Sequence, residues 1–136
     1  MASGELSAVR IAELYLERIA VVDRAGPTIN SVLVTNPDAL AHAAHADSER
    51  AAGRVRGPLH GIPVLLKDNI DTADQMRTTA GSLALAESIA TQDAGLVKRL
   101  RDGGAVILGK VNLSEWANIR SNRSTSGWSA VGGLTR

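Results

Sequence analysis

The chain has 136 residues, with 15 basic and 14 acidic side chains, a formal net charge of +1 and no cysteine. This length suits one domain or part of one, and the lack of cysteine excludes disulfides, a thiolate nucleophile and a cysteine-ligated zinc site. The 44% hydrophobic content is almost entirely aliphatic, and the aromatic residues are Tyr15, Trp116 and Trp128. We therefore expect no nucleic-acid interface built on base stacking and phosphate neutralisation.

The sequence also lacks the patterns of membrane and exported proteins. No stretch approaches the roughly 18 consecutive apolar residues of a membrane span, and the first residues lack the basic and apolar regions of a signal peptide. We expect no membrane partner and a cytoplasmic location, unless the sequence begins inside a longer protein.

The first predicted element is an amphipathic helix from Ser7 to about Val22, with Ser7 as its N-cap. Its apolar residues recur at helical spacing, at Val9, Ala12, Leu16 and Ile19. Gly26 and Pro27 end this pattern. Residues 29–35 then fit either a short strand or an extended linker.

A second helix is better marked. Asn36 is the expected cap, Pro37 takes the first helical position, and Gly53 stands where a left-handed residue commonly ends a helix. The alanine-rich body between them indicates close packing against a neighbouring element.

Beyond residue 57 the pattern changes to that of a βαβ unit. An apolar run at 62–66 predicts a strand covered on both faces, and residues 70–92 read as a loop. Asp93 is expected to cap a helix that ends at 103–104, and 105–108 predicts a second buried strand. Within that helix the residues expected to face inward are Leu96, Val97 and Leu100.

After the second strand, Asn112 and Glu115 have the spacing of a capping box for a short helix through Trp116. Together the elements predict an α/β protein in which N-terminal helices pack beside the first strands of a larger mixed sheet. We divide the chain near residue 57, into a helical part at 1–56 and an α/β part at 57–136.

Several residue patterns suggest chemistry that we do not expect. Residues 104–110 match the front of a phosphate-binding loop, but Val111 replaces the magnesium-binding hydroxyl and the intervening residues favour a buried strand. His42 and His45 lie three apart on a predicted helix, yet no further ligand pattern accompanies them, so we expect a solvated face and no metal. His60 stands alone in a turn.

The serines of the C-terminal segment are Ser121, Ser124, Ser126 and Ser129. The spacing around Ser129 misses the nucleophile elbow G-x-S-x-G by one residue. Loop serines commonly satisfy backbone groups, and we expect that role here.

Lys67 is the strongest candidate, because it follows an apolar strand at the edge where α/β proteins place their ligands. Burial there lowers the pKa of an amine, and a neutral amine can accept a proton from a hydroxyl. A structural ion pair of Lys67 with Asp68 or another carboxylate is the alternative, and the spacing alone does not separate the two.

Four strings resemble the amidase signature family, in order and with its spacing. They are GPLHGIPVLLKDN at 57–69, TAGS at 79–82, the segment 93–100 and GGAVILGKVNLSEWA at 103–117. The tail at 120–136 looks most like the peptide amidase branch of that family. The resemblance covers nearly the whole chain.

The resemblance implies hydrolysis of a carboxamide, or transfer of its acyl group, by a Ser–cis-Ser–Lys triad. The family's lysine falls on Lys67, which would accept a proton relayed through the cis-serine from the nucleophilic serine. Backbone N–H groups would hold the oxyanion. Trp116 and Asn118 match a segment that approaches the substrate, although Trp116 fits a packing role equally well. No metal or organic cofactor is implied.

In relatives both serines follow the segment at which this sequence stops. Residues 124–127 imitate the serine signature but align upstream of it, so we expect one catalytic group of three here and no turnover by this chain alone. We expect the substrate of the complete enzyme to be a small-molecule or peptide amide, with a peptide C-terminal amide as one candidate. The alternatives are one subunit of an amidotransferase, or a noncatalytic module that binds a partner chain and self-associates through exposed sheet edges.

Overall fold

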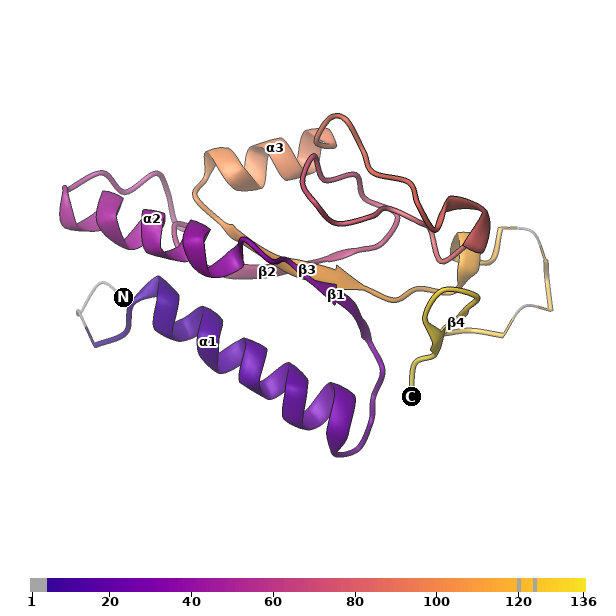
Figure 1. Ribbon diagram of the computed structural model, residues 1–136. Helices are drawn as coiled ribbons and strands as arrows, with labels where there is room; N and C mark the ends of the chain where they lie inside the picture. Colours follow the sequence, from indigo (N-terminus) through magenta and orange to yellow (C-terminus); the bar gives the residue numbers. More distant parts are fainter. Residues whose placement is uncertain (1–4, 120, 124) are drawn as a thin grey trace.

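The computed structural model describes residues 5–119, 121–123 and 125–136, which form helices around a small mixed sheet (Figure 1). The α-helices are α1 (Ala8–Arg18), α2 (Ala39–Ala51) and α3 (Gly95–Asp102). The strands are β1 (Val32–Thr35), β2 (Pro63–Lys67), β3 (Val106–Val111), β4 (Trp128–Ser129) and β5 (Gly133–Leu134). Within the described ranges, every helix is too short or too polar to cross a bilayer.

The main sheet has the strand order β1-β3-β2. Strand β2 runs parallel to β3, with α3 between them in the chain, and β1 runs antiparallel to β3. This arrangement confirms the predicted α/β class with a mixed sheet, and it resolves residues 29–35 in favour of a strand. The parts predicted at 1–56 and 57–136 share this sheet, because β1 pairs with β3 across the expected boundary; the boundary itself stays a prediction.

Helices α1 and α2 lie on one face of the sheet, and α3 lies on the other (Figure 1). Alanines let α1, α2 and β3 approach closely, as the composition of the second helix predicted. This core consists of Ala8, Ala12, Ala39, Ala43, Ala46, Val106 and Leu108. On the other face the buried residues are Leu66, Met76, Val97 and Ile107.

The first helix begins as predicted. The Ser7 side chain accepts a hydrogen bond from the Arg10 amide at 3.0 Å, which satisfies a free donor of the first turn. The α-helix ends at Arg18, and a π-helical segment, Ile19–Ala25, continues it. The predicted end near Val22 therefore lies inside this wider helical turn.

The start of the second helix differs from the prediction. Helix α2 begins at Ala39 with Asp38 at the N-cap position, so Asn36 lies outside the helix. The Asn36 side chain accepts from the Asp38 amide at 3.0 Å and donates to the Ile107 carbonyl at 2.8 Å. It therefore joins the helix start to β3. Gly53 has φ +75°, which confirms the left-handed end.

Helix α3 also begins later than expected. Asp93 does not cap it; its carboxylate accepts from the Ala73 amide at 2.8 Å and pairs with Arg101 at 3.0 Å. Val97 is buried as predicted, but Leu96 is exposed. The helix is short, and only one narrow stripe faces the sheet.

Candidate active site

Lys67 is the last residue of β2, at the C-terminal end of a strand that pairs in parallel with β3. The side chain is exposed, which corrects the expectation of a dry amine. The physical reason is that β2 lies at the edge of the sheet and only Leu66 in it is buried. A strand covered on one face cannot desolvate a side chain on the other.

Asp68 follows Lys67 and is almost completely buried. Its carboxylate accepts from the Thr79 hydroxyl and, at 3.2 Å, from the Thr79 amide. Burial raises the pKa of Asp68, and these hydrogen bonds and the charge of Lys110 oppose the rise only in part. The ion pairs among the described residues do not join Lys67 to Asp68, so the alternative considered for these two residues is not formed.

Lys110 is the group that sequence reasoning missed. It is 0% exposed, and its Nζ donates to the Ile70 carbonyl at 2.8 Å and to the Thr78 hydroxyl at 2.9 Å. Burial lowers the pKa of Lys110, and the charge of Asp68 opposes the change. The signal was available, because Lys110 also follows an apolar run, but it lay inside the match to a phosphate-binding loop. Most of the residues that match the phosphate-binding loop lie in β3, as their apolar character predicted.

One loop, residues 78–82, joins the end of β2 to the segment that contains Trp116. The amides of Thr79 and Ala80 donate to the Asp68 carbonyl at 3.1 and 2.9 Å. The Ala80 carbonyl accepts from the Trp116 amide at 3.0 Å. Gly81 has φ +78°, and a Cβ there would lie 2.6 Å from Ser129 Cβ, so the loop requires glycine at this position. Backbone hydrogen bonds therefore link the neighbour of Lys67 to Trp116.

Trp116 and Asn118 lie in a short 3₁₀ segment, Glu115–Asn118, and both are half-buried. Trp116, Ala117 and Asn118 have φ values of +51°, +53° and +63°, an uncommon left-handed run without glycine. Strain of this kind gathers at functional sites. Their proximity to a substrate stays a prediction.

The predicted capping box is not formed, because Asn112 has other partners. Its amide donates to the Gly133 carbonyl and to the Thr135 hydroxyl, both at 3.0 Å, and its Oδ1 accepts from the Ser129 hydroxyl at 2.6 Å. Glu115 accepts from the Ala130 amide at 3.0 Å. Both side chains thus hold the loop that contains the β4–β5 hairpin.

This hydrogen-bond network also gives a structural role to one of the C-terminal serines. Ser129 is buried, bonds Asn112 and accepts from the Gly132 amide at 2.9 Å, which is the structural role expected. Ser124 lies outside the described residues. Ser121 accepts from the Arg123 amide at 3.0 Å.

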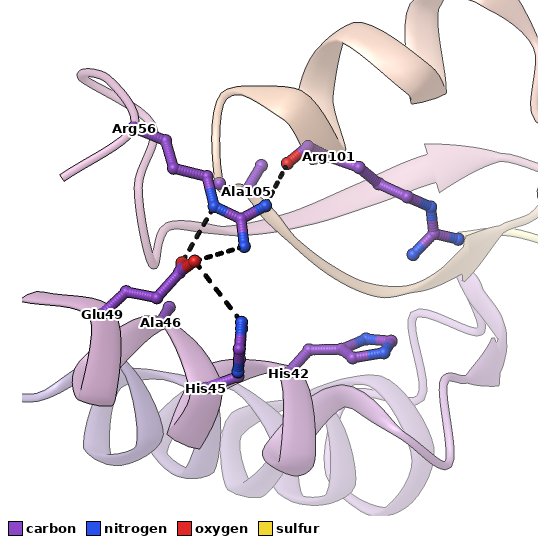
Figure 2. Close-up of a pocket in the computed structure, with 8 residues that line it drawn as sticks. His42, His45, Ala46, Glu49, Arg56, Arg101 and Ala105 are labelled. Atoms are coloured by element: carbon purple, nitrogen blue, oxygen red, sulfur yellow. Dashed lines mark hydrogen bonds and ion pairs between the residues drawn. The ribbon is translucent and has the colours of Figure 1, made fainter. Parts of the chain in front are cut away.

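A pocket beside α2 contains His42 and His45 (Figure 2). Glu49 also lines it, accepting from Arg56 at 2.7 and 2.9 Å and lying 3.4 Å from His45 Nε2. Figure 2 shows the His42 ring to one side of these contacts. In the part of the chain that the structure describes, no group of three or more His, Cys, Asp or Glu side chains could hold a metal.

His60 has a structural role that its isolation in the sequence did not indicate. The ring is buried, and its Nε2 lies 2.9 Å from the Ala46 carbonyl. The His60 carbonyl accepts from Arg50 at 2.8 Å. These contacts fix the turn before β2 against α2.

The geometry describes a mixed α/β protein with a lysine at a strand end and a glycine-serine loop beside it. A family model described as Amidase matches residues 10–129, and the chain belongs to this family. Peptide amidase from Stenotrophomonas maltophilia is 60% identical, with a TM-score of 0.94 over 98% of this chain and 27% of that one. A Bacillus anthracis amidase family protein is 44% identical, with a TM-score of 0.92 over 98% of this chain and 26% of that one.

Curated relatives include amidotransferase subunits. One subunit of the glutamyl-tRNA(Gln) amidotransferase of Methylobacillus flagellatus is 42% identical over 125 residues, which are 92% of this chain and 25% of the relative. A Schizosaccharomyces pombe protein that carries the name amidase is 50% identical over the full 136 residues, or 23% of its length. The chain therefore spans about a quarter of the length of the relatives it matches.

Proposed function

We propose that this chain is the N-terminal portion of an amidase that hydrolyses a linear carboxamide, with a peptide C-terminal amide as the leading substrate. The observation that carries the proposal is the 60% identity to a peptide amidase over 98% of the chain. A peptide amidase has also been crystallised with the competitive inhibitor chymostatin, and the same identity holds there. A cytoplasmic location belongs to the same proposal.

In this proposal Lys67 is the proton acceptor of a Ser–cis-Ser–Lys triad, and both serines lie in the portion that follows residue 136. Its place at the C-terminal end of β2 supports the role, because ligands of α/β proteins bind at this edge. In this proposal the rest of the complete enzyme covers the exposed amine, since burial lowers the pKa of a lysine and favours the neutral form that accepts a proton.

The test is a chimera in which residues 1–136 replace the matching segment of the Stenotrophomonas maltophilia enzyme. We expect ammonia release from a peptide C-terminal amide, and Lys67→Ala should lower kcat at least about a hundredfold, because a positioned base contributes that much. Lys98→Ala is the control: Lys98 is exposed and pairs with Asp102 at the surface, so the rate should be unchanged. Undiminished release by the Lys67→Ala chimera would refute the proton-acceptor role.

A role within an amidotransferase is the second candidate, favoured by the 42% identity to the glutamyl-tRNA(Gln) amidotransferase subunit. The two functions differ in the fate of the ammonia. A hydrolase releases it at full rate alone, whereas an amidotransferase needs a partner that receives it. Ammonia release by the chimera that depends on no added partner supports the hydrolase.

The isolated 136-residue chain should release no ammonia from the same peptide amide, because the proposal places two of three catalytic groups elsewhere. Measurable release that disappears in Lys67→Ala would place a nucleophile within this chain and would contradict that division of the site.

A further inference from the structure

The turn that follows Lys67 is held by a buried cation from the neighbouring strand. The Ile70 amide donates to the Lys67 carbonyl at 3.0 Å, which closes the turn. The Ile70 carbonyl accepts from Lys110 Nζ at 2.8 Å. Lys110 therefore makes a direct contact with the backbone of the turn that follows Lys67.

Lys110 cannot act on the Lys67 amine through side-chain contact. The register of the parallel pair places Lys110 opposite Leu66, and Lys67 opposite Val111. Because side chains alternate between faces along a strand, Lys110 shares the buried face of Leu66, and Lys67 belongs to the other face. Contacts that connect Lys110 to Lys67 therefore run through the backbone.

The surroundings of Lys110 fix its side chain in place. It also donates to the Thr78 hydroxyl at 2.9 Å and lies 3.5 Å from the Arg77 carbonyl. The acidic groups whose charges act on it are Asp68, Asp71 and Asp74. A buried charge costs free energy even when it is paired, so it is weak evidence for a purely stabilising role.

The backbone after Lys67 is also held by β3 itself and by the loop at 78–82. The Asp68 amide donates to the Val111 carbonyl at 3.0 Å, which extends the β2–β3 ladder by one residue. The Asp68 carbonyl accepts from Thr79 and Ala80, and its carboxylate accepts from Thr79. Lys110 and the loop that it holds through Thr78 thus complete a clamp around residues 67–70.

We propose that Lys110 is a positioning residue for Lys67: its ammonium, bonded to the Ile70 carbonyl and the Thr78 hydroxyl, fixes the turn from which the Lys67 amine reaches the reacting groups. The inference rests on the proposed function of Lys67. A base must stand within hydrogen-bond reach of its proton, and small displacements of a catalytic group cost large factors in rate. Lys67 is exposed in this chain, so the backbone clamp is the constraint that the chain itself supplies.

The test compares Lys110→Met and Thr78→Val in the chimera. Methionine keeps most of the volume and removes the charge, and valine removes only the hydroxyl. Thr78→Ser restores the hydroxyl and serves as the matched control. Active sites are counted by titration with an acylating inhibitor, so that a smaller folded fraction does not enter kcat.

With Lys110→Met and with Thr78→Val, we expect kcat per active site to fall about tenfold or more while KM changes little. Thr78→Ser should restore kcat. A smaller folded fraction alone does not change kcat per active site.

The outcomes separate the two proposals. If Lys67→Ala is fully active, the proposed function fails. If Lys67→Ala is inactive but Lys110→Met and Thr78→Val keep the normal kcat per active site, the function stands and the positioning inference is overturned.

A second readout needs no activity. In the 136-residue chain, hydrogen exchange of the Ile70 amide should be about tenfold faster in Lys110→Met and in Thr78→Val, because the turn opens locally. Lys98→Met, at an exposed lysine of α3, is the control and should leave the exchange unchanged. Equal exchange in all variants would overturn the clamp itself.

Discussion

Trp116, Ala117 and Asn118 form a left-handed turn without a glycine, next to the loop at 78–82. For L-residues this conformation costs roughly 1–2 kcal/mol per residue. The turn persists because the Trp116 amide is bonded to Ala80 and the Ala117 amide to the Ser114 carbonyl at 2.7 Å. Strain is therefore stored beside the candidate site.

Replacing Ala117 with glycine should release part of this strain. Ala117 is exposed, so Ala117→Gly removes no buried contact, and we expect the free energy of unfolding to rise by about 0.5–1 kcal/mol in urea denaturation. Ala44→Gly, on the exposed face of α2, is the matched control and should lower it by about 1 kcal/mol. A loss of stability in both variants would show that the turn is not strained.

Lys67 and Lys110 show how far sequence reasoning reaches at single residues. Both lysines follow apolar runs, and the sequence singled out Lys67 through its expected place at the ligand-binding edge of the sheet and through a family resemblance. It could not tell which of the two is buried, because burial depends on strand order: β3 lies between two strands, whereas β2 lies at the edge. The capping box failed for a similar reason, since Asn112 meets distant partners that spacing does not reveal.

Helix α1 is anchored to α2 at its first turn. The Asp47 carboxylate accepts from the Ala8 amide at 2.7 Å and from the Val9 amide at 3.0 Å. These are amides that have no partner within the helix, and a negative charge is favourable at a helix N-terminus. Asp47 of α2 thus caps the N-terminus of α1.

Asp47→Ala should therefore lower the free energy of unfolding by about 1–2 kcal/mol, in the range of a lost cap, as measured by urea denaturation. Ser48→Ala is the control, because the Ser48 hydroxyl bonds within its own helix, to the Ala44 carbonyl; its effect should stay within about 0.5 kcal/mol. Equal effects of the two substitutions would contradict the anchoring role.

The π-helical segment is joined to β1 by the buried carboxylate of Asp23. It accepts from the Ser31 amide at 2.7 Å, the Ser31 hydroxyl at 2.5 Å and the Val32 amide at 3.1 Å. Burial alone would raise the pKa of Asp23, but these hydrogen bonds and the charge of Arg24 together hold the pKa below its usual value. The ionised form is therefore stabilised by folding.

The sign of the pH dependence follows from this lowered pKa. The stability that ionised Asp23 contributes is fully present above the unfolded pKa, about 3.9, and is lost as the pH falls through the folded value. Asp23→Asn should lower the free energy of unfolding by about 1–3 kcal/mol at pH 7, and the difference from the parent should shrink in acid. Denaturation series at several pH values measure it; a difference independent of pH would contradict the role of the charge.

Helices were easier to predict than their ends. The periodicity of α1 and the Pro37 and Gly53 signals located the first two helices, because local sequence determines both features. Helix α3 begins later than predicted because the Asp93 carboxylate bonds Ala73, in the loop after β2, and Arg101, in the last turn of α3, and does not cap the first turn. Strand β1 stayed ambiguous in the sequence, since four residues become a strand only through pairing with β3.

The chain as a whole exposes apolar surface on two sides. Strand β2 is an edge strand, and its Leu65 is 37% exposed. Helix α1 and its neighbours contribute a second exposed apolar set, Leu6, Leu14, Tyr15 and Val21. The chain spans about a quarter of the length of its relatives, and large exposed apolar patches are typical of surfaces that meet further protein.

We therefore expect the isolated chain to self-associate in a concentration-dependent way, because an edge strand with exposed apolar side chains can pair with another copy. Leu65→Lys places a charge on this edge and should shift the population toward monomer in size-exclusion chromatography with light scattering. Val55→Lys is the matched control: Val55 is also apolar and exposed but lies in the loop before β2, so it should leave association unchanged. A compact monomer at every concentration would contradict the exposed edge, and equal effects of the two lysines would assign association to general apolar surface instead of to β2.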